Sequence, residues 1–120
     1  MSFDWMQYFN LAQLLLGQRA TGERDEATLR CAVSRCYYSA FCSARNHARD
    51  RFGWTPSYKP EDHSDVKRQF ALRARNKVAD GLDRLRQWRN QCDYDDEVPN
   101  VEILAKEAVK TTKVVFSELK

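Results

Sequence analysis

Glycine and proline are scarce in this chain of 120 residues, which contains four of the first and three of the second. Because so few residues interrupt regular structure, the sequence favours long helices over many short strands. No stretch alternates apolar and polar residues as a half-buried strand would. The sequence also lacks a glycine-rich phosphate loop, an HExxH pair, a clustered set of metal ligands and a nucleophile elbow. We therefore expect no metal ion and no cofactor.

Cysteine is present, but not in a pattern that binds zinc or forms a secreted disulfide framework. No two of the four cysteines make a CxxC pair, and Cys36 and Cys92 follow apolar spacings typical of small core residues. The N-terminus has no basic segment followed by an apolar run and a cleavage site, and Leu14–Leu16 is too short to cross a bilayer. These absences predict a cytoplasmic protein in a reducing compartment, with no membrane partner.

The net charge of +3 is too small to indicate nucleic-acid binding, but the charges are unevenly distributed. Between His63 and Asn90 there are eight Lys or Arg residues against three Asp, and four acidic residues follow within 93–97. A basic segment beside an acidic one suits an anionic ligand, a charged partner chain or internal pairing. The basic segment can equally be a solvated helix face.

Apolar residues recur at helical spacing along most of the chain, so we expect a single all-α domain over 1–120. Asp62 or Ser64 is the expected cap of the middle helical region, and Pro99 with Asn100 is the expected start of the last helix. The sequence predicts an antiparallel bundle of four to five helices with short connections. The expected elements are helices over about 4–19 and 24–52, a loop over 53–62, a helical region that starts at about 62–64 and continues, with a break near 76, into the segment around 89, and a helix from about 99 to the C-terminus.

Arg89 is the most unusual residue of the pattern, because it falls near the middle of an apolar arc. A guanidinium cannot lose its charge on burial, so it needs a partner, and Asp93 lies four residues later on the same side. One interpretation is a structural Arg89–Asp93 pair or an arginine that extends to solvent at a helix end. The other is a cation held in a cleft for phosphate or an RNA backbone. The arc is formed by Val78, Leu82, Leu85, Trp88 and Cys92.

Further candidates lie on the long helix expected over 24–52 and just beyond the loop. Arg35 and Tyr38 form a polar cluster that either faces solvent, or faces Arg89 or a dimer seam. His47 follows the apolar arc and is interpreted as a core histidine, and His63 as a local cap or a hydrogen-bond donor to the loop. The residues expected opposite the apolar arc of this helix are Arg35, Tyr38, Cys42, Arg45 and Arg49.

Two segments resemble signatures of HEPN-domain proteins. The run AVSRCYYSAFCSAR at 32–45 resembles the AVSRAYYAAFHAAR helix of that family. The run LRQWRNQCDYDD at 85–96 resembles the LxxLRNxADYDD signature of its small, stand-alone bacterial and archaeal branch. The run DHSDV at 62–66, followed by Phe70, resembles in outline the start of the family's middle helix. Together the motifs cover the chain from about the first helix to the C-terminus.

The resemblance implies an up-and-down helical bundle that is often a homodimer. It also implies a place in toxin–antitoxin systems, phage defence or RNA metabolism, frequently beside a small nucleotidyltransferase partner. Active HEPN ribonucleases carry an R-x4–6-H motif, and two copies meet to form a metal-independent site. Here the positions that would hold the histidine, 93–96, read Asp-Tyr-Asp-Asp, and position 42, often His in the related helix, is Cys42. The resemblance therefore carries over the arginine and asparagine but not the histidine.

Three functional hypotheses follow. The leading one is a dimeric HEPN-type binding module that engages RNA, a nucleotide or a partner protein. The second is a ribonuclease toxin with a variant site, and the third is a structural bundle in which Arg89 is an internal strut. A phenol is a poor base near neutral pH, which counts against Tyr94 as a replacement for the histidine. The candidate ligand residues are Arg35, Tyr38, Arg86, Arg89 and Asn90, and the candidate catalytic residues are Arg89, Asn90, Asp93 and Tyr94.

Overall fold

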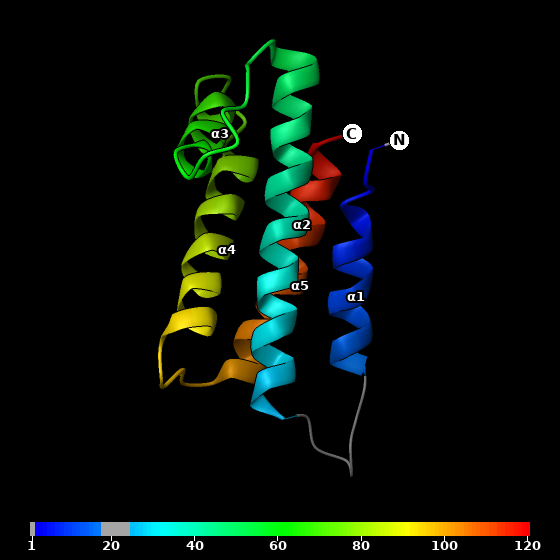
Figure 1. Cartoon of the computed structure of the whole chain (residues 1–120), viewed down its shortest axis with the longest axis vertical. Helices are drawn as coiled ribbons and strands as arrows, with labels where there is room; N and C mark the ends of the chain where they lie inside the picture. The colour runs from blue at the N-terminus through cyan, green and yellow to red at the C-terminus, as the bar shows by residue number, and fades with distance from the viewer. Residues whose placement is uncertain (1, 18–24) are drawn as a thin grey trace.

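The computed structural model describes residues 2–17 and 25–120, and within these ranges the chain forms five helices and no strand. The helices run up and down in a bundle in which the long α2 is central, and the short α3 lies across one end beside α4 (Figure 1). The all-α bundle predicted from the sequence is confirmed. The helices are α1 (Met6–Gly17), α2 (Glu26–Phe52), α3 (Asp62–Ala71), α4 (Asn76–Tyr94) and α5 (Val101–Glu118).

The ends of the helices follow from local side chains. Asp25 caps α2, because its carboxylate accepts a hydrogen bond of 2.7 Å from the amide of Thr28. Gly53 ends the same helix in the left-handed conformation, with φ of 69°, and its amide donates to the carbonyl of Ala48. At α1, the Asp4 carboxylate accepts from the amide of Met6. The expected break near residue 76 is confirmed, since α3 ends at Ala71 and α4 begins at Asn76.

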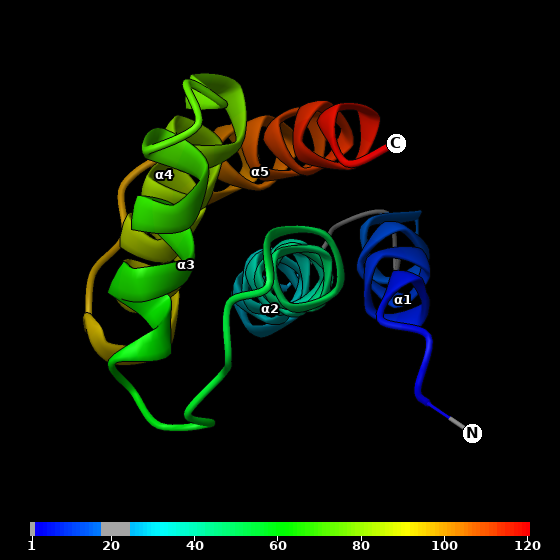
Figure 2. The same cartoon turned by 90° about the horizontal axis from the view of Figure 1, so that it is seen from above.

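The core is built around α2, which contacts each of the other four helices. Viewed along the bundle, α2 lies between α1 on one side and α3 and α4 on the other, and α5 runs across the top of the view from α4 toward α1 (Figure 2). Helices α4 and α5 pack closely at Gly81, where a Cβ built on this residue would lie 2.7 Å from Cγ2 of Val115. The largest fully buried side chains include Tyr37, Phe70, Leu85, Val33, Val66 and Val78.

Several expectations need correction. Cys42 lies on the side of α2 that carries Arg35 and Arg45, as expected, but it is buried there and only 4% exposed. Neither Asp62 nor Ser64 caps α3 with its side chain. The carboxylate of Asp62 instead accepts hydrogen bonds from the amides of Ser57 and Tyr58 and from the Ser57 hydroxyl, so it fixes the preceding loop. The first helix is described as far as Gly17, and its expected end near Arg19 falls within residues 18–24, which lie outside the described part of the chain.

Hydrogen bonds stabilise the ionised form of the Asp62 carboxyl although the side chain is buried. Burial alone would raise the pKa of this carboxyl, but the hydrogen bonds from Ser57 and Tyr58, together with the nearby Arg45 guanidinium, outweigh it and hold the pKa below its usual value. The loop that carries Trp54, Pro56 and Tyr58 is thus tied to the first turn of α3. Among the described helices, none combines the length and apolar character needed to cross a bilayer.

Candidate functional site

A groove of about 510 Å³ opens where α1, α2 and α4 meet, and we call it the Arg35 groove. It contains three guanidinium groups, from Arg35, Arg45 and Arg89, against the single carboxylate of Asp93, which leaves a formal charge of +2. Aromatic rings form much of the remaining wall. The lining residues are Trp5, Tyr8, Ser34, Arg35, Tyr38, Phe41, Cys42, Arg45, Arg89 and Asp93.

Arg89 is half-buried at the edge of the core and is already well paired. Its Nε forms an ion pair with Oδ2 of Asp93 at 2.8 Å, although this buried N–H makes no hydrogen bond with any described residue, and the two side chains are 17% and 27% exposed. Its other nitrogens donate to the Asn90 side-chain oxygen at 2.9 Å and to the Tyr94 hydroxyl at 3.2 Å. The guanidinium also lies 5.1 Å from the ring of Tyr38. The predicted Arg89–Asp93 pair is confirmed, and it withdraws part of the Arg89 charge from any ligand.

Arg35 is the less satisfied of the two arginines. Its guanidinium stacks 4.7 Å from the ring of Tyr8 and 5.6 Å from that of Tyr38. One terminal nitrogen reaches the Ser34 hydroxyl at 3.4 Å, which is a long hydrogen bond. Its Nε is buried and has no hydrogen-bond partner among the described residues. A buried donor left without an acceptor costs about 1–3 kcal/mol, so this N–H is poised to receive one.

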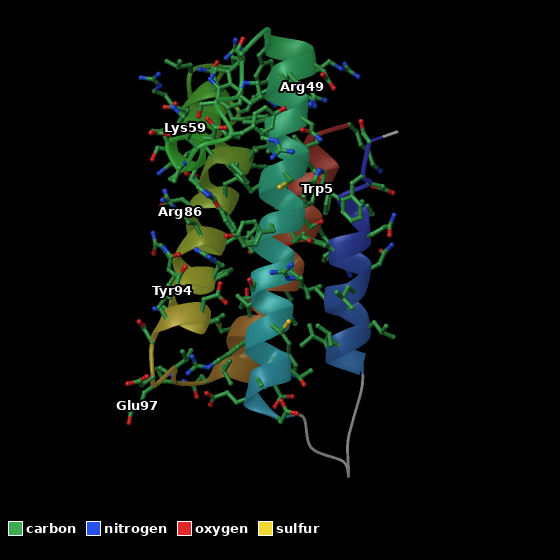
Figure 3. All side chains as sticks on the ribbon, viewed as in Figure 1. Trp5, Arg49, Lys59, Arg86, Tyr94 and Glu97 are labelled. Atoms are coloured by element: carbon green, nitrogen blue, oxygen red, sulfur yellow. The ribbon has the colours of Figure 1, made fainter. Side chains whose placement is uncertain are left out.

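Sequence reasoning did not assign Trp5, Tyr8 or Arg45 to the site. Arg45 lies 5.6 Å from the Trp5 ring, and the Trp5 carbonyl accepts a 2.8 Å hydrogen bond from Ser39 of α2. Figure 3 shows Trp5 beside α2 at the start of α1. The signal that could have found these residues is the aromatic content of 2–9, but its contact with α2 depends on how α1 packs, which periodicity does not specify.

His63 occupies a position that the sequence did not suggest. Its ring stacks on Phe41 at 4.4 Å, and its Nδ1 hydrogen-bonds the hydroxyl of Tyr37 rather than the loop. Burial lowers the pKa of His63, and the guanidinium groups of Arg86 and Arg89 lower it further, so the ring is neutral at pH 7.

The tautomer of His63 follows from its partner. Burial raises the pKa of Tyr37, which therefore stays a phenol with a proton to donate. Its hydroxyl has no other hydrogen-bond partner in the described ranges, so the phenol donates to Nδ1 of His63 and the imidazole proton resides on Nε2. His63 thus presents a fixed N–H donor on the side facing away from Tyr37. His47, by contrast, packs between Phe52 and Phe70, in keeping with its interpretation as a core residue.

The remaining predicted residues are only partly brought together. Arg35, Tyr38, Arg89 and Asp93 share the Arg35 groove, so Arg35 and Tyr38 do face Arg89. Asn90 and Tyr94 are exposed beyond its edge, where each contacts Arg89. Arg86 was grouped with this set, but it lines a separate groove between α3 and α4. Figure 3 shows Arg86 and Tyr94 at different levels along α4.

Comparison of the chain with protein-family models, curated proteins and solved structures gives no match. The resemblance to HEPN-domain proteins therefore remains a prediction from the motifs. Residues 2–17 and 25–120 contain no group of three or more His, Cys, Asp or Glu side chains placed to hold a metal ion. What the site does offer is positive charge, aromatic faces and unsatisfied N–H donors.

Proposed function

We propose that the protein is a HEPN-type binding module that engages RNA through the Arg35 groove. The observation that carries the proposal is the buried Nε of Arg35, which lacks a hydrogen-bond partner within the described residues and lies in a groove of formal charge +2. A phosphate oxygen would satisfy this donor, and arginine is the residue best suited to a forked contact with phosphate.

The aromatic wall supports RNA over a free inorganic anion. Bases stack on aromatic side chains and on guanidinium planes, and such stacking accepts any base. Tyr8, Tyr38 and Trp5 supply the rings, and Arg35 and Arg45 already stack on them. A ligand with both phosphates and bases uses both features of the groove.

Arg35 and Arg89 have different parts in the proposal. Arg35 makes the first contact, since its Nε has neither a hydrogen-bond partner nor an ion pair among the described residues, whereas the Nε of Arg89, which also lacks a hydrogen bond, lies beside a carboxylate. Arg89 contacts phosphate only as its pairing with Asp93 is loosened, because the carboxylate lies 2.8 Å from its Nε. We also propose that the protein forms a homodimer, that it acts in a toxin–antitoxin or phage-defence system, and that it has a nucleotidyltransferase-type partner. These three proposals rest on the resemblance to HEPN-domain proteins alone.

Salt-dependent binding of single-stranded RNA tests the proposal. For single strands, the logarithm of the binding constant falls with the logarithm of salt by about 0.7 per neutralised phosphate. We expect fluorescence anisotropy to show such a slope for the wild type and a shallower one for Arg35→Ala. Arg84→Ala is the matched control, because Arg84 is exposed on α4 and lines neither groove. Equal binding by the two variants, both folded by circular dichroism, contradicts the proposal.

One observation favours a second candidate, a metal-independent ribonuclease. His63 lies close enough to Arg86 and Arg89 for both to lower its pKa, so an imidazole stands near the arginines although position 93–96 has none. Its Nδ1 is occupied by Tyr37 and its Nε2 carries the proton, however, so neither nitrogen is free to accept a proton from a ribose 2′-hydroxyl. This is why we prefer the binding module.

RNA cleavage in the presence of a metal chelator separates the two candidates. The ribonuclease requires cleavage that is lost in both Arg89→Ala and His63→Gln while the fold is retained. Cleavage that survives both substitutions indicates a contaminating enzyme. The binding module predicts no cleavage by the purified wild type at any salt concentration at which it binds RNA.

A further inference from the structure

The second groove, between α3 and α4, is basic and is not used by the site described above. It has a volume of about 420 Å³, and we call it the His63 groove. Lys67, Arg68 and Arg86 line it together with one carboxylate, Asp83, which leaves a formal charge of +2. Leu82 and Ala71 add an apolar surface.

The positive charge of this groove is only partly neutralised. Lys67 pairs with Asp83 at 2.9 Å, and both side chains are more than 40% exposed. The guanidinium groups of Arg68 and Arg86 make no hydrogen bond or ion pair with any described residue, so both remain available. His63 adds a third donor, because its Nδ1 is held by Tyr37 and its Nε2 proton lies on the opposite edge of the ring.

The two grooves are joined by a third hollow. This hollow, of about 300 Å³, shares Phe41 and Arg45 with the Arg35 groove and shares His63 with the His63 groove. Figure 3 shows a residue from each of the three: Lys59 lies beside α3, and Arg86 and Trp5 lie lower in the view, on opposite sides of α2. Arg86 and Arg89 are also neighbours on one helix, since side chains three residues apart lie about 5–6 Å from each other at Cβ.

We propose that the three hollows form one track for a single-stranded RNA segment, with the His63 groove binding a phosphate beyond the one held in the Arg35 groove. This inference rests on the proposed function and names its ligand as an oligonucleotide, not a mononucleotide. Each of the larger hollows alone has the volume of a small-ligand site, so a mononucleotide fills only one of them. A strand that crosses the wall of His63 and Phe41 contacts both basic clusters.

The test compares a short and a long probe. The short probe is a dinucleotide, and the long probe is a single-stranded RNA of about 12 nucleotides, within the usual size range of single-strand sites. We expect the double substitution Arg68→Ala and Arg86→Ala to make the salt slope for the long probe shallower by about 0.7, which is the value for one phosphate. Binding of the dinucleotide should change no more than it does in the control Arg84→Ala.

The outcomes separate this inference from the proposed function. If the double variant binds the long probe as the Arg84→Ala control does, while Arg35→Ala weakens binding, the track is wrong and the proposed function stands. If Arg35→Ala has no effect but the double variant loses binding, the His63 groove is supported and the role of the Arg35 groove is overturned. If the wild type shows no salt-sensitive binding of either probe, both proposals fail and a protein ligand takes their place.

Discussion

Arg30 holds the end of α4 that carries the candidate site, and its replacement gives the sharpest prediction about stability. One of its terminal nitrogens donates to the carbonyls of Cys92, at 3.0 Å, and Asp95, at 2.5 Å, and the other to that of Asp96 at 3.1 Å. The carbonyl of Cys92 is one of the last four of α4, which have no partner within the helix. A guanidinium from α2 therefore replaces the missing donors and complements the negative end of the helix dipole.

The expected loss can be assembled from these contacts. The charge-assisted bond to the half-buried Cys92 carbonyl contributes about 1.5–3 kcal/mol, and the dipole contributes about 0.3–1 kcal/mol. The bonds to Asp95 and Asp96 are exposed, so water replaces them at little cost. The pair with Glu26 is a surface i,i+4 contact at 2.9 Å, worth about 0.3–0.5 kcal/mol. Arg30→Met should thus lower the free energy of unfolding by about 2–4.5 kcal/mol.

Urea unfolding followed by far-UV circular dichroism measures this difference. Arg30→Lys keeps the charge but not the fork, so we expect about half of the loss. Glu26→Gln removes only the surface pair and should cost less than about 0.5 kcal/mol. If Arg30→Met is no less stable than Glu26→Gln, the argument that the fork holds α4 is refuted. Fraying of the last turn of α4 should also expose Asp93, so the variant links stability to the site.

Three further predictions concern packing, acid and thiols. Gly81→Ala should destabilise the protein by about 1 kcal/mol in thermal unfolding. The new methyl group would lie 2.7 Å from Cγ2 of Val115, and such overpacking costs about 1–3 kcal/mol, which exceeds the helix-propensity gain of about 1 kcal/mol. A variant more stable than the wild type contradicts this prediction. The pKa of the Asp62 carboxyl is lower in the folded state than its unfolded value of 3.8, so the ionised carboxylate stabilises the fold above that pH. This stabilisation is lost as the pH falls through the folded pKa. The stability advantage of wild type over Asp62→Asn should therefore shrink below about pH 4. A thiol reagent should modify only Cys31 in the native state, since the other three cysteines are buried; fast reaction of a second thiol contradicts the core.

The helices were predictable from the sequence because their signals are local. Apolar spacing, the cap at Asp25 and the glycine at 53 act within one or two turns, so the bounds of α2 follow closely from the residues. The prediction that Asp62 caps α3 was wrong, because a carboxylate near the start of a helix can accept hydrogen bonds either from that helix or from the preceding loop. The choice depends on where Ser57 and Tyr58 place their amides, which is a property of the folded loop.

The candidate site was predictable only where its parts lie on one helix. Arg89 and Asp93 are four residues apart, so helix geometry brings them together, and the structure confirms the pair at 2.8 Å. The walls from Trp5 and Tyr8 and the position of His63 depend on the packing of three helices against α2. No spacing rule relates residues so distant in sequence, and the separate location of Arg86 could not be read from its place beside Arg89.

The ion pair with Asp93 changes the role that we assign to Arg89. From the sequence it was the main candidate for an anion contact, because a guanidinium on an apolar arc needs a partner. In the structure Asp93, Asn90 and Tyr94 already surround that guanidinium, although its Nε makes no hydrogen bond with a described residue, whereas the Nε of Arg35 has neither a hydrogen-bond partner nor an ion pair among them. A ligand that displaces Asp93 must compete with an ion pair, whereas no carboxylate of the described residues pairs with Arg35. Affinity should therefore depend more on Arg35, and the contribution of Arg89 should grow when Asp93 is replaced by Asn.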